Sequence, residues 1–195
     1  MKHEVRLIGG RPREVRLIGG QWKRSKLPVA DKPGLRPTPD RVRETLFNWL
    51  GQDLTGWRCL DAFAGSGALG FEAASRGAAQ VLLLERDPEL ARSLKASQQR
   101  LGATTLRVEN TDALAWMARC AAGSFDLVLL DPPFDAGLLQ PALAQALRLV
   151  PEGGYVYLED GQPLPEPPPG VQAFRSARAG AVHHGLWRRG YTPAD

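Results

Sequence analysis

The chain has 195 residues, 43% hydrophobic and 24% charged, a size and balance that suit one globular domain with a sizeable core rather than two full domains. Its apolar runs fall far short of the roughly 18 residues of a membrane helix, its first ten residues lack a signal peptide's apolar stretch, and its two cysteines form no CxxC or Cys/His cluster. We therefore expect a cytoplasmic protein with no membrane association and no metal site.

The front of the chain carries most of the excess positive charge. Residues 1–50 hold twelve of the 25 Lys and Arg residues but five of the 21 Asp and Glu residues, so the net charge of +4 divides into +7 before residue 51 and −3 after it. This asymmetry is typical of a polyanion-contacting arm on a near-neutral body, although a solvated basic tail has the same balance. We interpret 1–50 as a basic, RNA-contacting N-terminal segment and 51–195 as the main domain.

The heptapeptide EVRLIGG occurs twice in this segment, at Glu4 to Gly10 and at Glu14 to Gly20. Two copies do not make a repeat protein, so we interpret them as a local duplication or a misassigned start. Under this interpretation the first copy is dispensable, and residues 1–13 are expected to be disordered.

A helix is predicted after the duplication, with Thr38 as its N-cap and Pro39 at its first position. Apolar residues then recur at helical spacing up to Leu50, and two arginines fall off that apolar face. Together with basic residues upstream, Arg41 and Arg43 predict a surface that contacts phosphates. The side chain of Trp22, close to these basic residues in the sequence, is predicted to contact RNA as well. The predicted RNA-binding residues are Trp22, Lys23, Arg24, Arg36, Arg41 and Arg43.

Strand and helix patterns alternate after Trp57, which predicts a parallel sheet covered on both faces. The predicted strands span residues 57–65, 79–87, 105–110, 125–131 and 153–160, and the predicted helices span 67–77, 87–102, 112–121 and 137–150. A proline-rich stretch over 162–170 cannot pair regularly and is expected to be a surface connector. Two alternating segments over 171–190 then predict an antiparallel pair that turns near Gly180. His183 and His184 fall in the last of these strands, and we interpret them as surface and core residues rather than ligands.

A glycine-rich loop, DAFAGSGALG, follows the first predicted strand. Its residues Gly65, Gly67 and Gly70 match GxGxxG, a pattern in which glycines let a ligand approach the backbone, although an ordinary glycine turn also fits. Ligands of such sheets bind outside the carboxyl ends of the strands. The second strand ends at Glu85, whose carboxylate can accept both hydroxyl groups of a ribose.

The residues after the third predicted strand suit an adenine ring. Asp112 can accept a hydrogen bond from the adenine amino group, and the Ala113 backbone can contact the ring. Capping of the next helix by Thr111 or Asp112 explains the same residues equally well. Up to this point NAD and S-adenosylmethionine both remain candidate cofactors.

The fourth predicted strand ends in DPPF, Asp131 to Phe134, which separates these two cofactors. Two successive prolines hold the chain extended and remove backbone N–H donors. The Asp131 carboxylate and the Pro132 carbonyl then offer two acceptors without a donor, which complements an –NH2 group, and the Phe134 ring can stack on a planar base. The alternative is a strand exit with Phe134 in the core, but a dehydrogenase has no use for the whole tetrad.

The glycine loop followed by DPPF resembles the class I S-adenosylmethionine-dependent methyltransferases that modify exocyclic amines. The stretches RLIGGQWKRSKLP, PGLRPTPDRVRETLFNWL and CLDAFAGSGALGFEAASRGA narrow the resemblance to bacterial 16S ribosomal RNA (guanine-N2)-methyltransferases of the RsmD type, over roughly Arg16 to Arg189. The resemblance implies an α/β fold: a Rossmann-like, seven-stranded, mostly parallel sheet with an antiparallel last strand. It also makes 51–195 the methyltransferase domain.

The resemblance implies a role for each site residue. It implies transfer from S-adenosylmethionine to a guanine of 16S ribosomal RNA, within an assembled small-subunit particle. We expect the enzyme to act as a monomer. The implied cofactor-binding residues are Asp61, Ala62, Phe63, Gly65, Ser66, Gly67, Glu85, Arg86, Asp112 and Ala113. The implied catalytic residues are Asp131, Pro132, Pro133 and Phe134.

Three other functions stay open from the sequence. An amino-methyltransferase acting on DNA adenine or protein glutamine uses the same tetrad. An NAD-dependent oxidoreductase explains the glycine loop and Glu85 but leaves DPPF unused. An RNA-binding module without enzymatic activity explains the basic front but needs no glycine loop.

Overall fold

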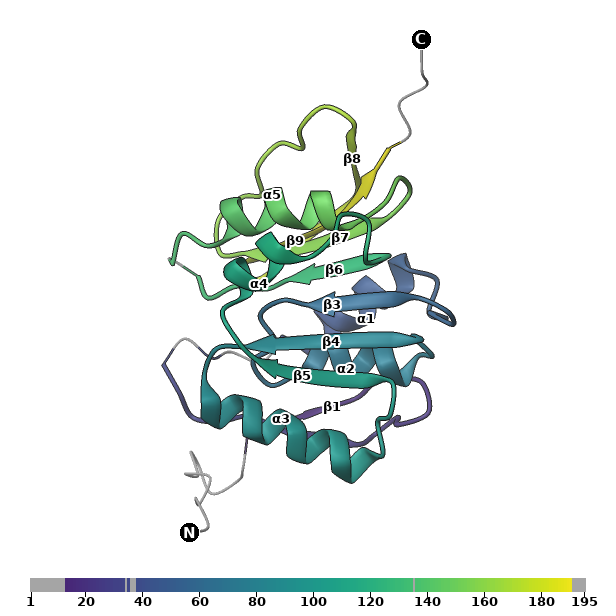
Figure 1. Ribbon diagram of the computed structural model, residues 1–195, viewed down its shortest axis with the longest axis vertical. Helices are drawn as coiled ribbons and strands as arrows, with labels where there is room; N and C mark the ends of the chain where they lie inside the picture. The colour runs from purple at the N-terminus through teal and green to yellow at the C-terminus, as the bar shows by residue number, and fades with distance from the viewer. Residues whose placement is uncertain (1–12, 34, 36–37, 135, 191–195) are drawn as a thin grey trace.

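A seven-stranded sheet forms the centre of the molecule in the computed structural model, which describes residues 13–33, 35, 38–134 and 136–190 (Figure 1). The strand order is β5-β4-β3-β6-β7-β9-β8. In chain order the strands are β3 (Arg58–Asp61), β4 (Gln80–Glu85), β5 (Leu106–Asn110), β6 (Leu127–Leu130), β7 (Tyr155–Asp160), β8 (Val171–Ala179) and β9 (Val182–Arg189).

Among the described strands of this sheet, only β9, the last in the chain, is antiparallel to its neighbours. β3 pairs in parallel with β4 and β6, β4 with β5, and β6 with β7, whereas β9 is antiparallel to both β7 and β8. The predicted sheet, with its antiparallel last strand and a turn near Gly180, is therefore confirmed. The first copy of EVRLIGG and Arg36, one of the predicted RNA-binding residues, lie outside the described residues.

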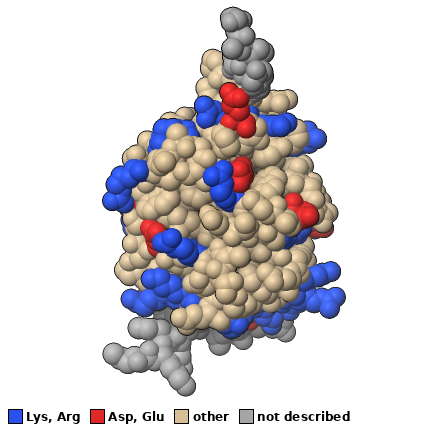
Figure 2. Space-filling view, turned by 45° about the vertical axis from the view of Figure 1, so that its right-hand side comes forward, with Lys and Arg blue, Asp and Glu red and all other residues tan. Residues whose placement is uncertain are grey.

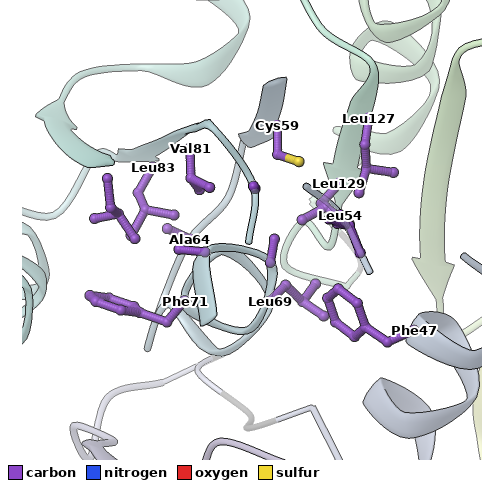
Figure 3. Close-up of a cluster of buried hydrophobic side chains, with 14 of the residues drawn as sticks. Phe47, Leu54, Cys59, Ala64, Leu69, Phe71, Val81, Leu83, Leu127 and Leu129 are labelled. Atoms are coloured by element: carbon purple, nitrogen blue, oxygen red, sulfur yellow. The ribbon is translucent and has the colours of Figure 1, made fainter. Parts of the chain in front are cut away.

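Helices cover both faces of the sheet, as predicted. They are α1 (Asp40–Trp49), α2 (Ala68–Ser75), α3 (Pro88–Leu101), α4 (Ala113–Arg119) and α5 (Leu139–Leu149). Side chains of α1, α2 and α3 share one apolar cluster with the sheet, and those of α4 and α5 share another on the opposite face. Figure 3 shows part of the first cluster, where Leu69 and Phe71 of α2 lie among side chains of β3, β4 and β6. No helix among the described residues is long and apolar enough to span a bilayer.

The helix boundaries follow from local chemistry. Asp87 caps α3 by accepting from the N–H groups of Glu89 and Leu90, with Pro88 at the first position, and Gly102 ends the helix in the left-handed conformation. Both features were predicted. At α1 the prediction is wrong by one residue, because Pro39 occupies the N-cap and Thr38 makes no cap hydrogen bond. The Thr38 hydroxyl bonds to Asp131 instead.

The second copy of EVRLIGG is folded onto the main domain. It forms β1 (Glu14–Arg16), which pairs with β2 (Lys26–Pro28), and Leu17 and Leu27 join the same apolar cluster as α2. The backbone at Gly20 has a positive φ of 77° and approaches the end of α2 so closely that a Cβ would overlap the Ser75 carbonyl. The described part of the N-terminal segment therefore shares the core of the domain.

Candidate active site

A cavity of about 830 Å³ opens where five parallel strands of the sheet end. Residues that follow β3, β4, β5, β6 and β7 all line it, together with residues from the segment before α1. This is the edge at which open α/β sheets bind ligands, and it is the place that the sequence predicted. The predicted residues that line it are Asp61, Ala62, Phe63, Gly65, Ser66, Glu85, Arg86, Asp112, Ala113, Asp131, Pro133 and Phe134.

The three glycines of the GxGxxG match have different positions. Gly65 lines the cavity and has a φ of 57°, so the loop turns there at a residue without a side chain. Gly67 and Gly70 are buried and are not lining residues: a Cβ at Gly67 would come within 2.7 Å of Phe71 and Leu94. At Gly70 a Cβ would come within 2.0 Å of Leu83 in β4, so this glycine allows α2 to pack on the sheet, whereas Gly67 allows close contact with α3. Gly67 does not line the cavity, and its predicted contact with the cofactor stays a prediction.

Glu85 at the end of β4 is fixed by backbone donors. Its carboxylate accepts from the N–H of Gly65 at 2.9 Å and from the N–H of Asp87 at 2.9 Å. Each oxygen has further lone pairs, so the group can still accept from hydroxyl groups in the cavity. The position of the Glu85 carboxylate at the cavity suits the predicted contact with ribose. That contact stays a prediction.

Asp61, at the end of β3, is buried with one oxygen unpaired. Its Oδ2 accepts from the Gly70 N–H at 3.0 Å, whereas its Oδ1 has no hydrogen-bond partner among the described residues. Burial, opposed by the Gly70 N–H and aided by the charges of Asp131 and Glu85, raises the pKa of this carboxyl to about 7. An unpaired carboxylate oxygen beside a cavity is a site for a cationic or hydrogen-bond-donating ligand group.

Asp131, directly after β6, is half-buried at the cavity and belongs to a chain of polar groups that continues into the core. Its Oδ2 accepts from the Thr38 hydroxyl at 3.2 Å, and its carboxyl is also hydrogen-bonded to that of Glu159. Burial raises its pKa to about 6, while the hydrogen bonds from Glu159 and Thr38 oppose that rise. The carboxyl oxygens of Asp131 can accept hydrogen bonds from a ligand amine.

The rest of the DPPF tetrad lies around this carboxylate. Pro133 and Phe134 line the cavity, and the Phe134 ring covers Gly161, where a Cβ would meet the ring at 3.2 Å. Pro132 is buried and is not a lining residue, so the acceptor role of its carbonyl stays a prediction. The half-buried Phe134 offers an aromatic surface beside the carboxylate, as stacking on a base requires.

Asp112 was given two alternative roles, helix capping and contact with adenine, and the structure shows the capping. Asp112 is the N-cap of α4, and its Oδ2 accepts from the Ala115 N–H at 2.9 Å. The residue also lines the cavity beside Ala113. A contact with adenine therefore remains a prediction for a residue whose carboxylate is already partly engaged.

The predicted RNA-binding residues divide by exposure. Lys23, Arg24 and Arg41 are exposed, and Trp22 is half-buried against the core. The prediction is wrong for Arg43, whose side chain is fully buried and bonded to Asp40 and Glu72. A guanidinium enclosed by two carboxylates satisfies its charge inside the protein, and no phosphate reaches it.

Comparison with known proteins decides the family. Residues 15–188 match the family described as Conserved hypothetical protein 95. The ribosomal RNA small subunit methyltransferase D of Escherichia coli (strain K12) is 42% identical over 194 residues, which cover 95% of this chain and 90% of that protein. The enzyme of the same name from Haemophilus influenzae is 44% identical over 177 residues, covering 85% and 84%. The chain belongs to this methyltransferase family.

A solved structure agrees with this membership. The Escherichia coli protein yhhF superposes with a TM-score of 0.82 at 40% identity, over 92% of this chain and all of that one. A methyltransferase needs a methyl donor. The carboxyl groups of Asp61, Glu85 and Asp131 all line the cavity, so the cavity suits a donor molecule that carries hydroxyl and cationic groups.

Sequence reasoning missed four residues that line the cavity or lie behind it. Thr38 was expected to cap a helix, and Glu159 and Tyr157 were expected only to belong to a strand. The signal for Glu159 was a charged residue inside the otherwise apolar run YVYLED. Lys32 also lines the cavity and is paired with Asp87 at 2.7 Å, a contact between segments 55 residues apart that no local pattern reveals.

Proposed function

We propose that this methyltransferase transfers a methyl group from S-adenosylmethionine to the N2 amine of a guanine in small-subunit ribosomal RNA. The observation that carries the proposal is the Asp131 carboxyl group beside the half-buried ring of Phe134 in a cavity at the strand ends. The ribosomal substrate is supported by the names of the relatives at 42% and 44% identity. We further propose an assembled small-subunit particle as substrate and a monomeric enzyme in the cytoplasm.

The residues that hold the donor follow from the cavity walls. Asp61, with its unpaired oxygen, and the loop from Ala62 to Ser66 hold the amino acid end, while Glu85 accepts from the ribose. Asp112 and Ala113 flank the adenine. When bound, S-adenosylmethionine supplies an electrophilic methyl group on a positively charged sulfur.

Asp131 and Phe134 prepare the guanine for reaction. The lone pair of N2 is conjugated with the purine ring, so the free amine is a poor nucleophile. Hydrogen bonds from its N–H groups to Asp131 and to the Pro132 carbonyl orient it and favour a pyramidal nitrogen. Phe134 stacks on the base, which offsets part of the cost of removing it from a helix. Positioning in a site that excludes water supplies most of the acceleration.

Replacement of Asp131 by Ala tests this proposal. Loss of the acceptor should lower methyl transfer by about 10²–10⁴-fold, while S-adenosylmethionine still binds because the walls formed by β3 and β4 are unchanged. The assay measures labelled methyl transfer to small-subunit particles that lack the modification, followed by digestion to nucleosides. Asp53→Asn is the matched control, because Asp53 is exposed and precedes β3, away from the strand ends.

Each result has a defined meaning. Labelled N2-methylguanosine from the natural protein, and its loss in Asp131→Ala, support the proposal. Label in another base or in protein keeps the amine chemistry and overturns the substrate. Full activity in Asp131→Ala overturns the role of the carboxylate, and failure of the natural protein to bind S-adenosylmethionine overturns the donor.

A further inference from the structure

Behind Asp131 lies a second carboxyl group that is not part of the cavity wall. Glu159 is 3% exposed, near the end of β7, and its carboxyl is hydrogen-bonded to that of Asp131. The Tyr157 hydroxyl donates to Glu159 Oε1 at 2.6 Å, and the Thr38 hydroxyl donates to Asp131 Oδ2. The four side chains form one connected chain from the core to the cavity.

The sheet register produces this arrangement. Leu130 of β6 lies opposite Leu158 of β7, so the next residues along both strands, Asp131 and Glu159, are neighbours. Alternation along β7 places Tyr157 on the same face as Glu159. The contact between the two carboxyl groups is therefore set by the backbone pairing of two central strands.

Two carboxyl groups in direct contact inside a protein share a proton, because two neighbouring negative charges cannot both be kept there. Burial and the negative charge of Asp131 raise the pKa of Glu159 well above its ordinary value. Glu159 is the deeper of the two carboxyl groups, at 3% exposure, whereas Asp131 is half-buried and lines the cavity. Because charge is less costly at the more exposed position, we assign the shared proton to Glu159 and the negative charge to Asp131.

The other polar groups near the pair bring no positive charge to it. Tyr157 on β7 and Asp61 on β3 act on Glu159, and His184 of β9 lies opposite Glu159 in the register. Burial lowers the pKa of His184, which keeps that ring neutral near pH 7. Among the described residues, no Lys or Arg forms an ion pair with either carboxyl group.

We propose that Glu159 is a positioning residue of the methyltransferase: its neutral carboxyl group donates a hydrogen bond to Asp131 and holds that carboxylate ionised and oriented toward the substrate amine. The inference rests on the proposed function of Asp131. Glu159 does not line the cavity and touches no substrate, so it acts only through Asp131.

Two replacements of Glu159 separate hydrogen bonding from packing. Glu159→Gln keeps a donor of the same shape, whereas Glu159→Met fills the same space with no donor. With Met, burial of Asp131 is no longer offset by that hydrogen bond, so the acid limb of kcat should move up by about one pH unit or more. At pH 7 kcat should fall by about twofold or more and recover toward pH 9, while in Glu159→Gln the acid limb should stay near that of the natural protein.

The experiment measures kcat and KM for the particle between pH 5 and pH 9. Affinity for S-adenosylmethionine and thermal unfolding are measured in parallel, so that a folding defect is recognised. Tyr157→Phe is the matched control: it removes a buried hydroxyl from the same strand that bonds to Glu159 and not to Asp131, and its acid limb should move less than that of Glu159→Met.

The outcomes distinguish this inference from the proposed function. If Asp131→Ala is inactive and Glu159→Met has the natural pH profile, the inference is wrong and the proposed function stands. Equal losses in the Gln and Met variants with an unmoved acid limb also overturn it, since they mark a packing role. Full activity in Asp131→Ala overturns the proposed function and the inference with it.

Discussion

Asp61 combines two requirements that oppose each other. Its carboxylate accepts a hydrogen bond from the Gly70 N–H and thereby joins β3 to α2, but its second oxygen is buried and has no hydrogen-bond partner in the part of the chain that the structure describes. Desolvation raises the pKa of this carboxyl to about 7. In the protein without ligand, ionisation of this buried carboxyl therefore costs free energy. A bound hydrogen-bond donor or cation would lower that cost by pairing with the second oxygen.

Asp61→Asn should raise the stability of the protein without ligand at pH 8. The folded-state pKa of about 7 exceeds the ordinary 3.8, so the contribution of Asp61 is fully present below pH 4 and is lost as pH rises through 7. Asparagine cannot ionise, so the fall in unfolding free energy between pH 5 and pH 8 should shrink by roughly 2–4 kcal/mol. Denaturant unfolding at both pH values measures this change.

A second carboxyl provides the contrast. Hydrogen bonds from Thr55 lower the pKa of exposed Asp53, so Asp53→Asn should not stabilise the protein at pH 8. Affinity of Asp61→Asn for S-adenosylmethionine should fall at the same time. An Asn variant that is less stable than the natural protein at pH 8 contradicts the assigned cost of the buried charge.

At the scale of elements, α2 connects the sheet to the N-terminal segment. All eight of its residues are buried, which marks a helix covered on every side. Glu72 on this helix accepts from the N–H groups of Ile18 and Gly19 and bonds to the guanidinium groups of Arg43 and Arg76. One carboxylate therefore holds the N-terminal segment, α1 and α2 together.

Glu72→Ala should destabilise the protein by about 3–5 kcal/mol, because it leaves the buried charge of Arg43 with Asp40 as its one remaining acidic partner among the described residues. Amide hydrogen exchange at Ile18 and Gly19 should accelerate, and urea unfolding gives the free energy. The double variant Arg43→Met/Glu72→Leu should recover part of the loss, since an apolar pair replaces a buried ion pair at little cost. A loss below about 1 kcal/mol for Glu72→Ala contradicts this account.

At the scale of the whole molecule, positive charge is spread rather than gathered. Figure 2 shows Lys and Arg over much of one face, with fewer acidic side chains between them. The net charge of +4 comes from residues 1–50, where Lys23, Arg24 and Arg41 are exposed. We expect these three residues to contact phosphates of the RNA, while the general positive field speeds encounter with RNA.

Replacing Lys23, Arg24 and Arg41 together by Glu should weaken RNA binding and flatten its salt dependence. Each lost phosphate contact lowers the slope of log affinity against log salt by about 0.7–0.9, so the triple variant should lose a slope of about 2–3. A titration at several salt concentrations measures it. Arg107→Glu/Arg119→Glu is the control, since both residues are exposed and belong to β5 and α4. Equal effects in both variants contradict a localised contact surface.

Much of this architecture was predictable from the sequence because the relevant signals are local. Apolar periodicity, Gly102 and the Asp87-Pro88 pair predicted the elements, and acids placed after strands predicted the cavity. Arg43 was mispredicted because its partner Glu72 lies 29 residues away, on a helix whose contact with α1 no local pattern encodes. Glu159 was missed for the same reason: its role depends on a neighbouring strand.

The position of β9 between β7 and β8 determines when the sheet is completed during synthesis. β7 presents Val156, Tyr157 and Leu158, all fully buried, and its outer edge stays unpaired until β9 has emerged. His184 of β9 also stacks on Trp49 of α1. A nascent or truncated chain that ends before residue 182 therefore exposes an apolar sheet edge, which is a template for aggregation.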